Sequence, residues 1–83
     1  MSAAKELEDA AGKYASEAIR FDSQGARGMA VQSYQQAIST LIKLAKIYPD
    51  YNLNKLYLDR APTYQERIKA LSSIHGRIKR KFE

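Results

Sequence analysis

Few residues of this 83-residue chain are of types that carry out covalent or metal chemistry. It has no cysteine, and the single histidine, His75, has no second histidine or cysteine with which to hold a metal ion. The acidic residues of the first 22 positions fall mostly on the polar side of a helical pattern, so no general acid and base share a cleft. No Walker loop or G-x-G-x-x-G motif is present. We therefore expect no catalysis, no cofactor and no metal site.

Two features could suggest nucleic-acid binding. Gly25 and Gly28 have the G-x-x-G spacing of an RNA-binding loop, but that loop needs neighbouring strands, so a turn between helices explains them better. Tyrosines can stack on bases, and the chain has six. Four of these occupy apolar positions of helical patterns, namely Tyr14, Tyr34, Tyr57 and Tyr64. We therefore expect them to pack in or beside the core.

The net charge of +5 is unevenly distributed. Residues 1–22 sum to −2, residues 23–59 to +2 and residues 60–83 to +5. A basic end can attract phosphates or anionic lipid, although in a small domain it more often lies at a solvated helix end. The bases nearest the end of the sequence are Arg77, Lys79, Arg80 and Lys81.

The apolar spacing predicts two antiparallel helices. The first covers about residues 3–24, with apolar residues four and three apart, and Gly25 is typical of a helix end. The second covers about residues 27–48 and stops at Pro49. Because only about four residues join them, the two helices must run antiparallel.

A third helical pattern covers about residues 52–81, but Pro62 lies inside it. Proline in a helix interior costs roughly 3 kcal/mol and disfavours helical geometry at the preceding residue. We therefore expect this helix to be broken or kinked near Pro62. No strand pattern competes, so the predicted fold is all-α: a single domain over residues 1–83, forming an up-down-up three-helix bundle.

Gly12 is unusual because it lies in the middle of the first predicted helix. There it costs about 1 kcal/mol relative to alanine. Together with Ala11, Ala15 and Ala18 it forms a row of small side chains. This row either lets another helix of the bundle approach closely or forms a shallow peptide-binding groove.

Seven positions over the first two helices resemble a microtubule-interacting and trafficking (MIT) domain. Their spacing reads A-x3-D-x2-G-x4-A-x3-Y-x2-A-[IV] and consists of Ala18, Asp22, Gly25, Ala30, Tyr34, Ala37 and Ile38. A third helix with Tyr64 and Arg67 follows, and the Lys46–Asp50 junction is similar to archaeal members. Tetratricopeptide helix pairs share part of this pattern, so a fragment of a helical-repeat protein is an alternative.

The resemblance implies a cytoplasmic adaptor without enzymatic activity. Such domains often stand at the N-terminus of the AAA ATPase that disassembles ESCRT-III filaments in membrane trafficking and, in archaea, in cell division. They bind short motifs of ESCRT-III tails, either as a helix between helices 2 and 3 or as an extended proline-rich segment between helices 1 and 3. The resemblance implies neither nucleic-acid binding nor membrane insertion, and oligomers only through a parent ATPase ring.

The residues favour the groove between helices 1 and 3. Members that bind a helical peptide often have leucine after the helix-3 tyrosine, whereas Gln65 follows Tyr64 here. The predicted peptide-binding residues are Ala11, Gly12, Ala15, Ile19, Tyr64, Arg67 and Leu71. The alternative function is binding of nucleic acid or an anionic membrane through the basic C-terminal residues.

Overall fold

Three helices make up the protein in the computed structural model, which describes residues 3–51 and 54–81, with backbone alone for residues 54, 56, 57 and 73–81. Helix α1 spans Ala3–Ser23, α2 spans Arg27–Ile47 and α3 spans Asn54–Lys81. The described residues contain no strand, so the predicted all-α three-helix fold is confirmed. Residues 52 and 53, where we placed the start of the third helix, lie outside the described part.

A glycine-dependent turn ends α1 and reverses the chain. Gly25 has φ of +78°, which a residue with a Cβ adopts only with strain. The N–H of Ala26 donates to the carbonyl of Phe21 at 2.9 Å, and the N–H of Gly25 donates to that of Asp22 at 3.1 Å. This pair of bonds is the Schellman motif, which satisfies the last carbonyls of a helix. The motif places Asp22 in the final turn of α1.

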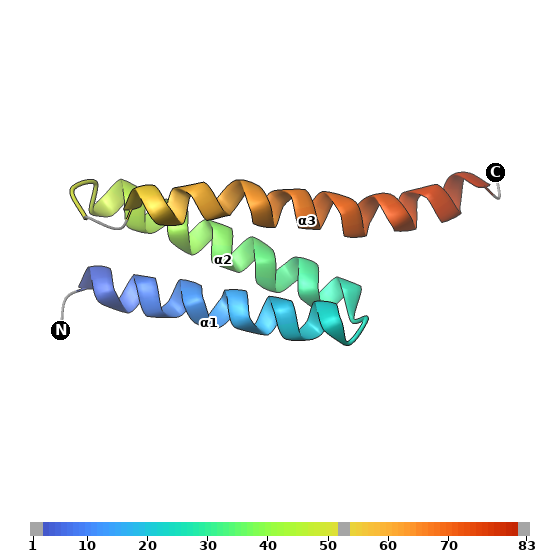
Figure 1. Ribbon diagram of the computed structural model, residues 1–83, viewed down its shortest axis with the longest axis horizontal. Coiled ribbons are helices and arrows are strands. Elements are labelled where there is room, and N and C mark those ends of the chain that lie inside the picture. Colours follow the sequence, from blue (N-terminus) through green and yellow to red (C-terminus); the bar gives the residue numbers. More distant parts are fainter. Residues whose placement is uncertain (1–2, 52–53, 82–83) are drawn as a thin grey trace.

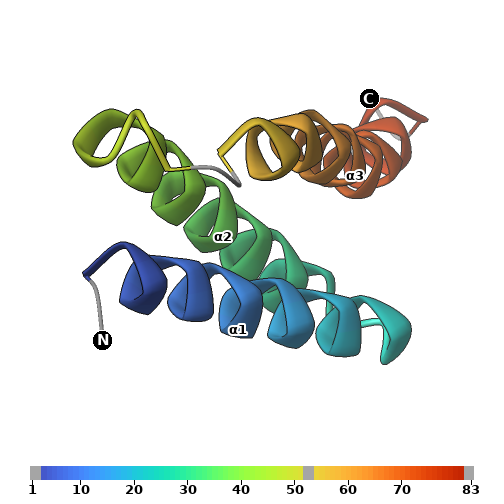
Figure 2. The ribbon, with the colours of Figure 1, turned by 60° about the vertical axis from the view of Figure 1, so that its left-hand side comes forward.

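Helix α2 is the central element of the fold. Figure 2 shows it crossing between α1 and α3, and it packs against both of them. Its buried side chains recur three and four positions apart and so form one broad face of the helix, and they are Ala30, Ser33, Tyr34, Ala37, Ile38, Leu41 and Leu44. In α1, by contrast, the buried residues Ala4, Ala11 and Ala18 recur every seven positions along a single stripe.

The backbones of α1 and α3 stay apart, although side chains of both helices meet in the core cluster that contains Ala18 and Leu71. Among the described residues no Cα of α1 lies within 8 Å of a Cα of α3. Figure 1 shows both running in the same direction, with α2 behind them and the C-terminal part of α3 extending beyond the other two. Side chains of all three helices line a groove between α1 and α3, to which α2 contributes Leu41.

We expected α3 to be broken or kinked near Pro62, and the break does not occur, since α3 is continuous from Asn54 to Lys81. Proline removes the N–H that would donate to the carbonyl of Leu58, four residues earlier. Pro62 is exposed and Leu58 is 42% exposed, so the missing hydrogen bond falls on the solvent-facing side of α3. Ala61 is buried, at 7% exposure. Packing of α3 on α2 therefore keeps the helix intact on both sides of the proline.

Within the described ranges, none of the helices combines the length and the apolar composition that crossing a membrane requires.

Candidate functional site

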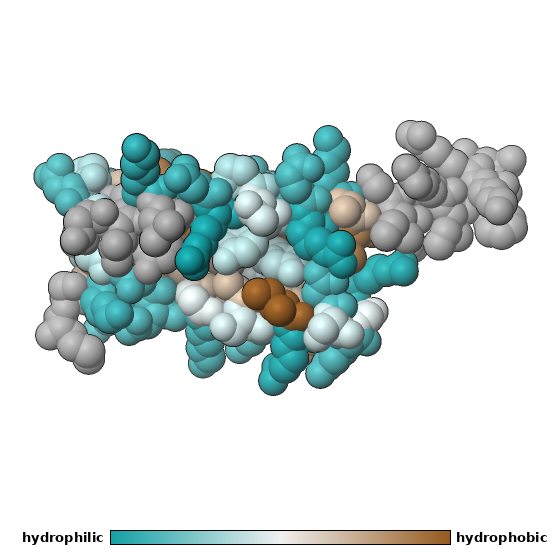
Figure 3. Space-filling view, in the orientation of Figure 1, coloured by the Kyte–Doolittle hydropathy of each residue, from teal (hydrophilic) through white to brown (hydrophobic). Residues whose placement is uncertain are grey.

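A hollow of about 430 Å³ lies between α1 and α3. We call it the α1/α3 groove. Its lining residues come from all three helices: Glu8, Asp9, Ala11, Gly12, Ala15, Ser16 and Ile19 from α1, Leu41 from α2, and Arg60 and Tyr64 from α3. Figure 3 shows this face, where pale, weakly polar surface with one strongly hydrophobic area is bordered by hydrophilic side chains.

Five of the seven residues predicted to bind a peptide line this groove, namely Ala11, Gly12, Ala15, Ile19 and Tyr64. Ile19 is 57% exposed, which leaves an aliphatic side chain available at the surface. Ala15 is half-buried and Ala11 is buried against the neighbouring helix. The spacing of small residues along α1 thus places their side chains beside one continuous hollow.

Gly12 does not serve close helix packing. A Cβ built on it would meet no atom within 4 Å. The interpretation that the row of small residues lets another helix approach is therefore wrong at Gly12, whereas Ala18 is fully buried in the core cluster with Ala30 and Leu71. The missing side chain instead widens the α1/α3 groove.

Leu71 lies elsewhere. It is 5% exposed and packs in the core cluster with Ala18, Ala30 and Tyr34. Its remaining surface lines a separate hollow with Arg27, Gly28, Val31 and Ser72. The sequence pattern placed it on the same helical stripe as Tyr64, but seven residues of helix carry it about 10 Å along the axis, past the groove.

Arg67 stands at one end of the groove and is bound to Asp22. Its Nε donates to Asp22 Oδ2 at 2.6 Å and its Nη2 donates to Asp22 Oδ1 at 2.7 Å. The hydroxyl of Tyr34 also donates to Asp22 Oδ2, at 3.0 Å. The structure therefore directs this guanidinium at an internal carboxylate, whereas the sequence suggested a donor to the peptide.

These contacts change the ionisation of the groups involved. The hydrogen bond from Arg67 lowers the pKa of Asp22, while partial burial opposes that effect and Tyr34 adds to it. Burial raises the pKa of Tyr34, and its hydrogen bond to Asp22 raises it further. The ring centroids of Tyr34 and Tyr64 are 5.6 Å apart, and the ring planes are inclined by 30°. This contact connects the hydrogen-bonded residues Asp22, Tyr34 and Arg67 with Tyr64 in the wall of the groove.

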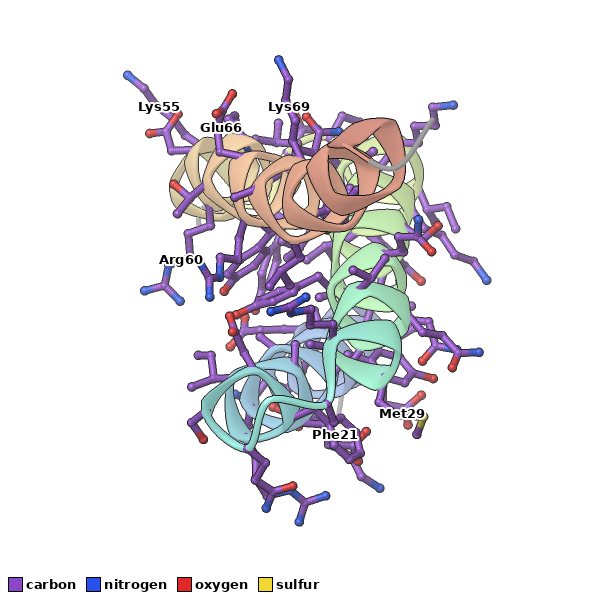
Figure 4. All side chains as sticks on the ribbon, turned by 90° about the vertical axis from the view of Figure 1, so that its right-hand side faces the viewer. Phe21, Met29, Lys55, Arg60, Glu66 and Lys69 are labelled. Atoms are coloured by element: carbon purple, nitrogen blue, oxygen red, sulfur yellow. The ribbon has the colours of Figure 1, made fainter. Side chains whose placement is uncertain are left out.

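Sequence reasoning missed the polar residues of the groove. Glu8 and Asp9 begin it on α1, where Lys5 pairs with both at 3.1 and 3.3 Å. Arg60 stands opposite on α3, and Figure 4 shows its side chain extending toward the space between α3 and α1. Arg60 precedes Tyr64 by four positions, so the two side chains lie on the same face of α3. That spacing is the sequence feature from which Arg60 could have been predicted at the groove.

A second hollow, of about 370 Å³, lies between α2 and α3 and is lined by Gln35, Ile38, Ser39, Gln65 and Ile68. Gln65, which we contrasted with the leucine of other members, faces this surface. Its lining has no charged residue, so it offers fewer polar anchors than the α1/α3 groove.

Several sequence predictions concern side chains outside the described part, namely those of Tyr57, His75 and the basic residues Arg77, Lys79, Arg80 and Lys81. Within that part, no three histidine, cysteine, aspartate or glutamate side chains are grouped closely enough to hold a metal ion.

This three-helix unit has an open surface groove and a small core, which is the architecture of a protein-interaction module. Consistent with this, the profile of the MIT (microtubule interacting and transport) domain family matches residues 8–73. The chain belongs to the MIT domain family, whose members are non-catalytic and bind peptide motifs of partner proteins. No curated protein matches the chain.

Proposed function

We propose that this domain is a cytoplasmic adaptor that binds short C-terminal motifs of ESCRT-III-like filament proteins and so brings an AAA ATPase to the filaments. Membership of the MIT family supports the adaptor role. The Lys46–Asp50 junction resembles archaeal members of the family, and we propose on that basis a role in cell division or membrane trafficking. In this proposal the peptide is extended and occupies the α1/α3 groove.

The open surface at Gly12 carries the choice of groove. A glycine inside a helix costs about 1 kcal/mol relative to alanine, and no neighbour of Gly12 lies close enough to require it. An incoming peptide backbone would use that space. From Glu8 to Ile19 the groove follows α1 for about 17 Å, which suits about five residues of extended, proline-rich chain.

The polar residues at the groove give such a peptide its anchors. A proline-rich segment has free backbone carbonyls and is already extended, so it loses little conformational entropy on binding. Arg60 and the Tyr64 hydroxyl can donate to those carbonyls, while Ile19 and Ala15 contact the proline rings. A short motif buries little area, so we expect micromolar affinity, strengthened by multivalency when domains are displayed on an ATPase ring.

Titration with labelled ESCRT-III tail peptides tests this proposal. The proline-rich peptide should bind the wild type saturably, with a dissociation constant of about 1–100 μM. Ala15→Asp puts a charge on the groove wall and should weaken this binding at least about tenfold, because the carboxylate would be desolvated by the peptide. Ser39→Asp, on the α2/α3 hollow, is the matched control and should leave it unchanged.

The outcomes separate the parts of the proposal. If neither proline-rich nor helical peptides bind below millimolar concentration, the adaptor function is wrong. If Ser39→Asp removes binding and Ala15→Asp does not, the function stands and the choice of groove is wrong.

A further inference from the structure

Asp22 occupies a position that its own helix does not favour. It lies in the last turn of α1, where the helix dipole is negative and a carboxylate is destabilised. Nevertheless its side chain is only 15% exposed and its pKa is lowered, because Arg67 donates to it. Local structure therefore does not account for an acid here, and its contacts with the other helices do.

The contacts of Asp22 join all three helices at a single carboxylate. Arg67 of α3 uses two N–H groups on its two oxygens, and Tyr34 of α2 adds a third hydrogen bond. A bidentate arginine–carboxylate pair is both stronger and more restrictive in geometry than a single hydrogen bond. Arg67 cannot turn toward the groove without breaking both bonds.

This group lies one helical turn beyond the α1/α3 groove on both sides. Asp22 follows the groove residue Ile19 by three positions, and Arg67 follows Tyr64 by three positions. At the other end of the groove the hydroxyl of Tyr51, in the α2–α3 loop, donates to Glu8. Because the backbones of α1 and α3 do not come close, their separation depends on such side-chain links, on the core cluster that contains Ala18 and Leu71, and on α2.

We propose that Asp22, Arg67 and Tyr34 form a latch that sets the separation of α1 and α3 and thereby the width of the groove. Asp22 and Arg67 are then positioning residues: they control peptide affinity without touching the peptide. The part that concerns affinity rests on the proposed function, whereas the part that concerns helix separation does not.

The separation can be measured without any peptide. The natural chain has no cysteine, so spin labels at Lys13→Cys on α1 and Glu66→Cys on α3 report one distance by pulsed electron paramagnetic resonance. Asp22→Asn and Arg67→Gln should each broaden the distance distribution relative to the wild type. The control Lys69→Gln removes a neighbouring charge of α3 whose side chain points away from α1 in Figure 4, and should leave the distribution unchanged. A distribution that is unchanged in both latch variants overturns the latch.

Peptide affinity distinguishes a latch from a direct contact. With the proline-rich peptide, Asp22→Asn and Arg67→Gln should each weaken binding about threefold to tenfold, and the double variant no further, because both remove the same link. Arg67→Lys keeps the charge but not the two-pronged bond, so it should behave like Arg67→Gln. The controls Asp59→Asn and Lys69→Gln should bind as the wild type does.

Other results would overturn the proposal. If Arg67 contacted the peptide, Arg67→Gln would weaken binding while Asp22→Asn left it unchanged or tightened it, and the two effects would not coincide. If the wild type binds no peptide, the adaptor function fails, and the distance measurement alone still decides the latch. Urea unfolding of each variant establishes that the affinities refer to folded protein.

Discussion

At the scale of single residues, the side chains with most consequence are those held by partners far away in the sequence. Asp22 and Arg67 are 45 positions apart. The sequence suggested that Arg67 donates to the peptide, and it indicated for Asp22 only a place in the family spacing. The structure joins them to each other. The positions of the small residues were easier to predict. Gly12 and Ala15 line the groove as expected, because a residue with little or no side chain lies where its backbone lies.

The Asp22 carboxylate predicts a dependence of stability on pH. Because Arg67 lowers its pKa in the folded protein below the ordinary value of 3.8, the unfolded chain binds the proton more readily. Its stabilising contribution is therefore complete above about pH 4 and is lost as the pH falls through the folded-state pKa. Urea unfolding should show that the free energy of unfolding changes less between pH 6 and pH 3 for Asp22→Asn than for the wild type.

Salt provides the control for that measurement. The side chain of Arg67 is 47% exposed, so solvent and ions screen the pair. At pH 6, the difference in the free energy of unfolding between the wild type and Asp22→Asn should be smaller in about 1 M salt, where the Debye length is about 3 Å. An equal pH dependence in the two proteins would mean that the ion pair contributes nothing to stability.

At the scale of helices, local preference and tertiary packing oppose each other in α3. Proline indicates an end or a bend, yet the helix continues through Pro62 because the residues on both sides bury apolar surface on α2. In α1, by contrast, the end of the helix is determined locally. The backbone hydrogen bonds of the Schellman turn at Gly25 end α1 independently of the residues that pack against this helix.

Replacing Pro62 by alanine should stabilise the domain. The new N–H restores the hydrogen bond to the Leu58 carbonyl, and alanine is about 3 kcal/mol more favourable than proline inside a helix. Because the restored hydrogen bond lies on the solvent-facing side of α3, where water competes for it, we expect a gain of about 1–3 kcal/mol in the free energy of unfolding, measured in urea. A loss of stability would show that the proline shapes α3 for packing on α2.

Two glycines should respond to alanine in opposite ways. Gly12→Ala meets no atom within 4 Å in a helical backbone, so it should stabilise the domain by about 1 kcal/mol and weaken peptide binding by narrowing the groove. Gly25→Ala has equal space but a φ of +78°, so it should destabilise by about 1–2 kcal/mol and leave the groove unaltered. Thermal unfolding and peptide titration of both variants measure these effects. If Gly12→Ala bound peptide as tightly as the wild type, the peptide would not pass over this position.

At the scale of the whole molecule, the site exists because α1 and α3 both pack on one broad face of α2 while their own backbones stay apart. In the described part of the chain, side chains alone connect α1 with α3, in the core cluster and in the pair of Asp22 with Arg67. The molecule is thin, with extents of 51 × 20 × 15 Å, so most of its surface is open to partners. Such a shape serves recognition of an extended segment rather than enclosure of a small substrate.

Removing residues 77–83 tests whether the basic end contributes to function. The deletion takes away four bases and Glu83, so the net charge falls from +5 to +2. Binding of the proline-rich peptide should stay within about twofold, since the α1/α3 groove lies in residues 8–64. Weak association with anionic vesicles should decline steeply. If the deletion removed peptide binding, the basic end would belong to the site.

The sequence by itself determined three helices, their order, the turn at Gly25 and the row of small residues on α1. These depend on neighbours within one or two turns, so periodicity and turn chemistry suffice to predict them. The tertiary structure decided that α3 continues through Pro62, that Leu71 lies in the core and that Arg67 binds Asp22. It also decided which side chains line the groove, including Leu41 and Arg60. These features depend on the axial shift and separation of helices packed on α2, which no local pattern encodes.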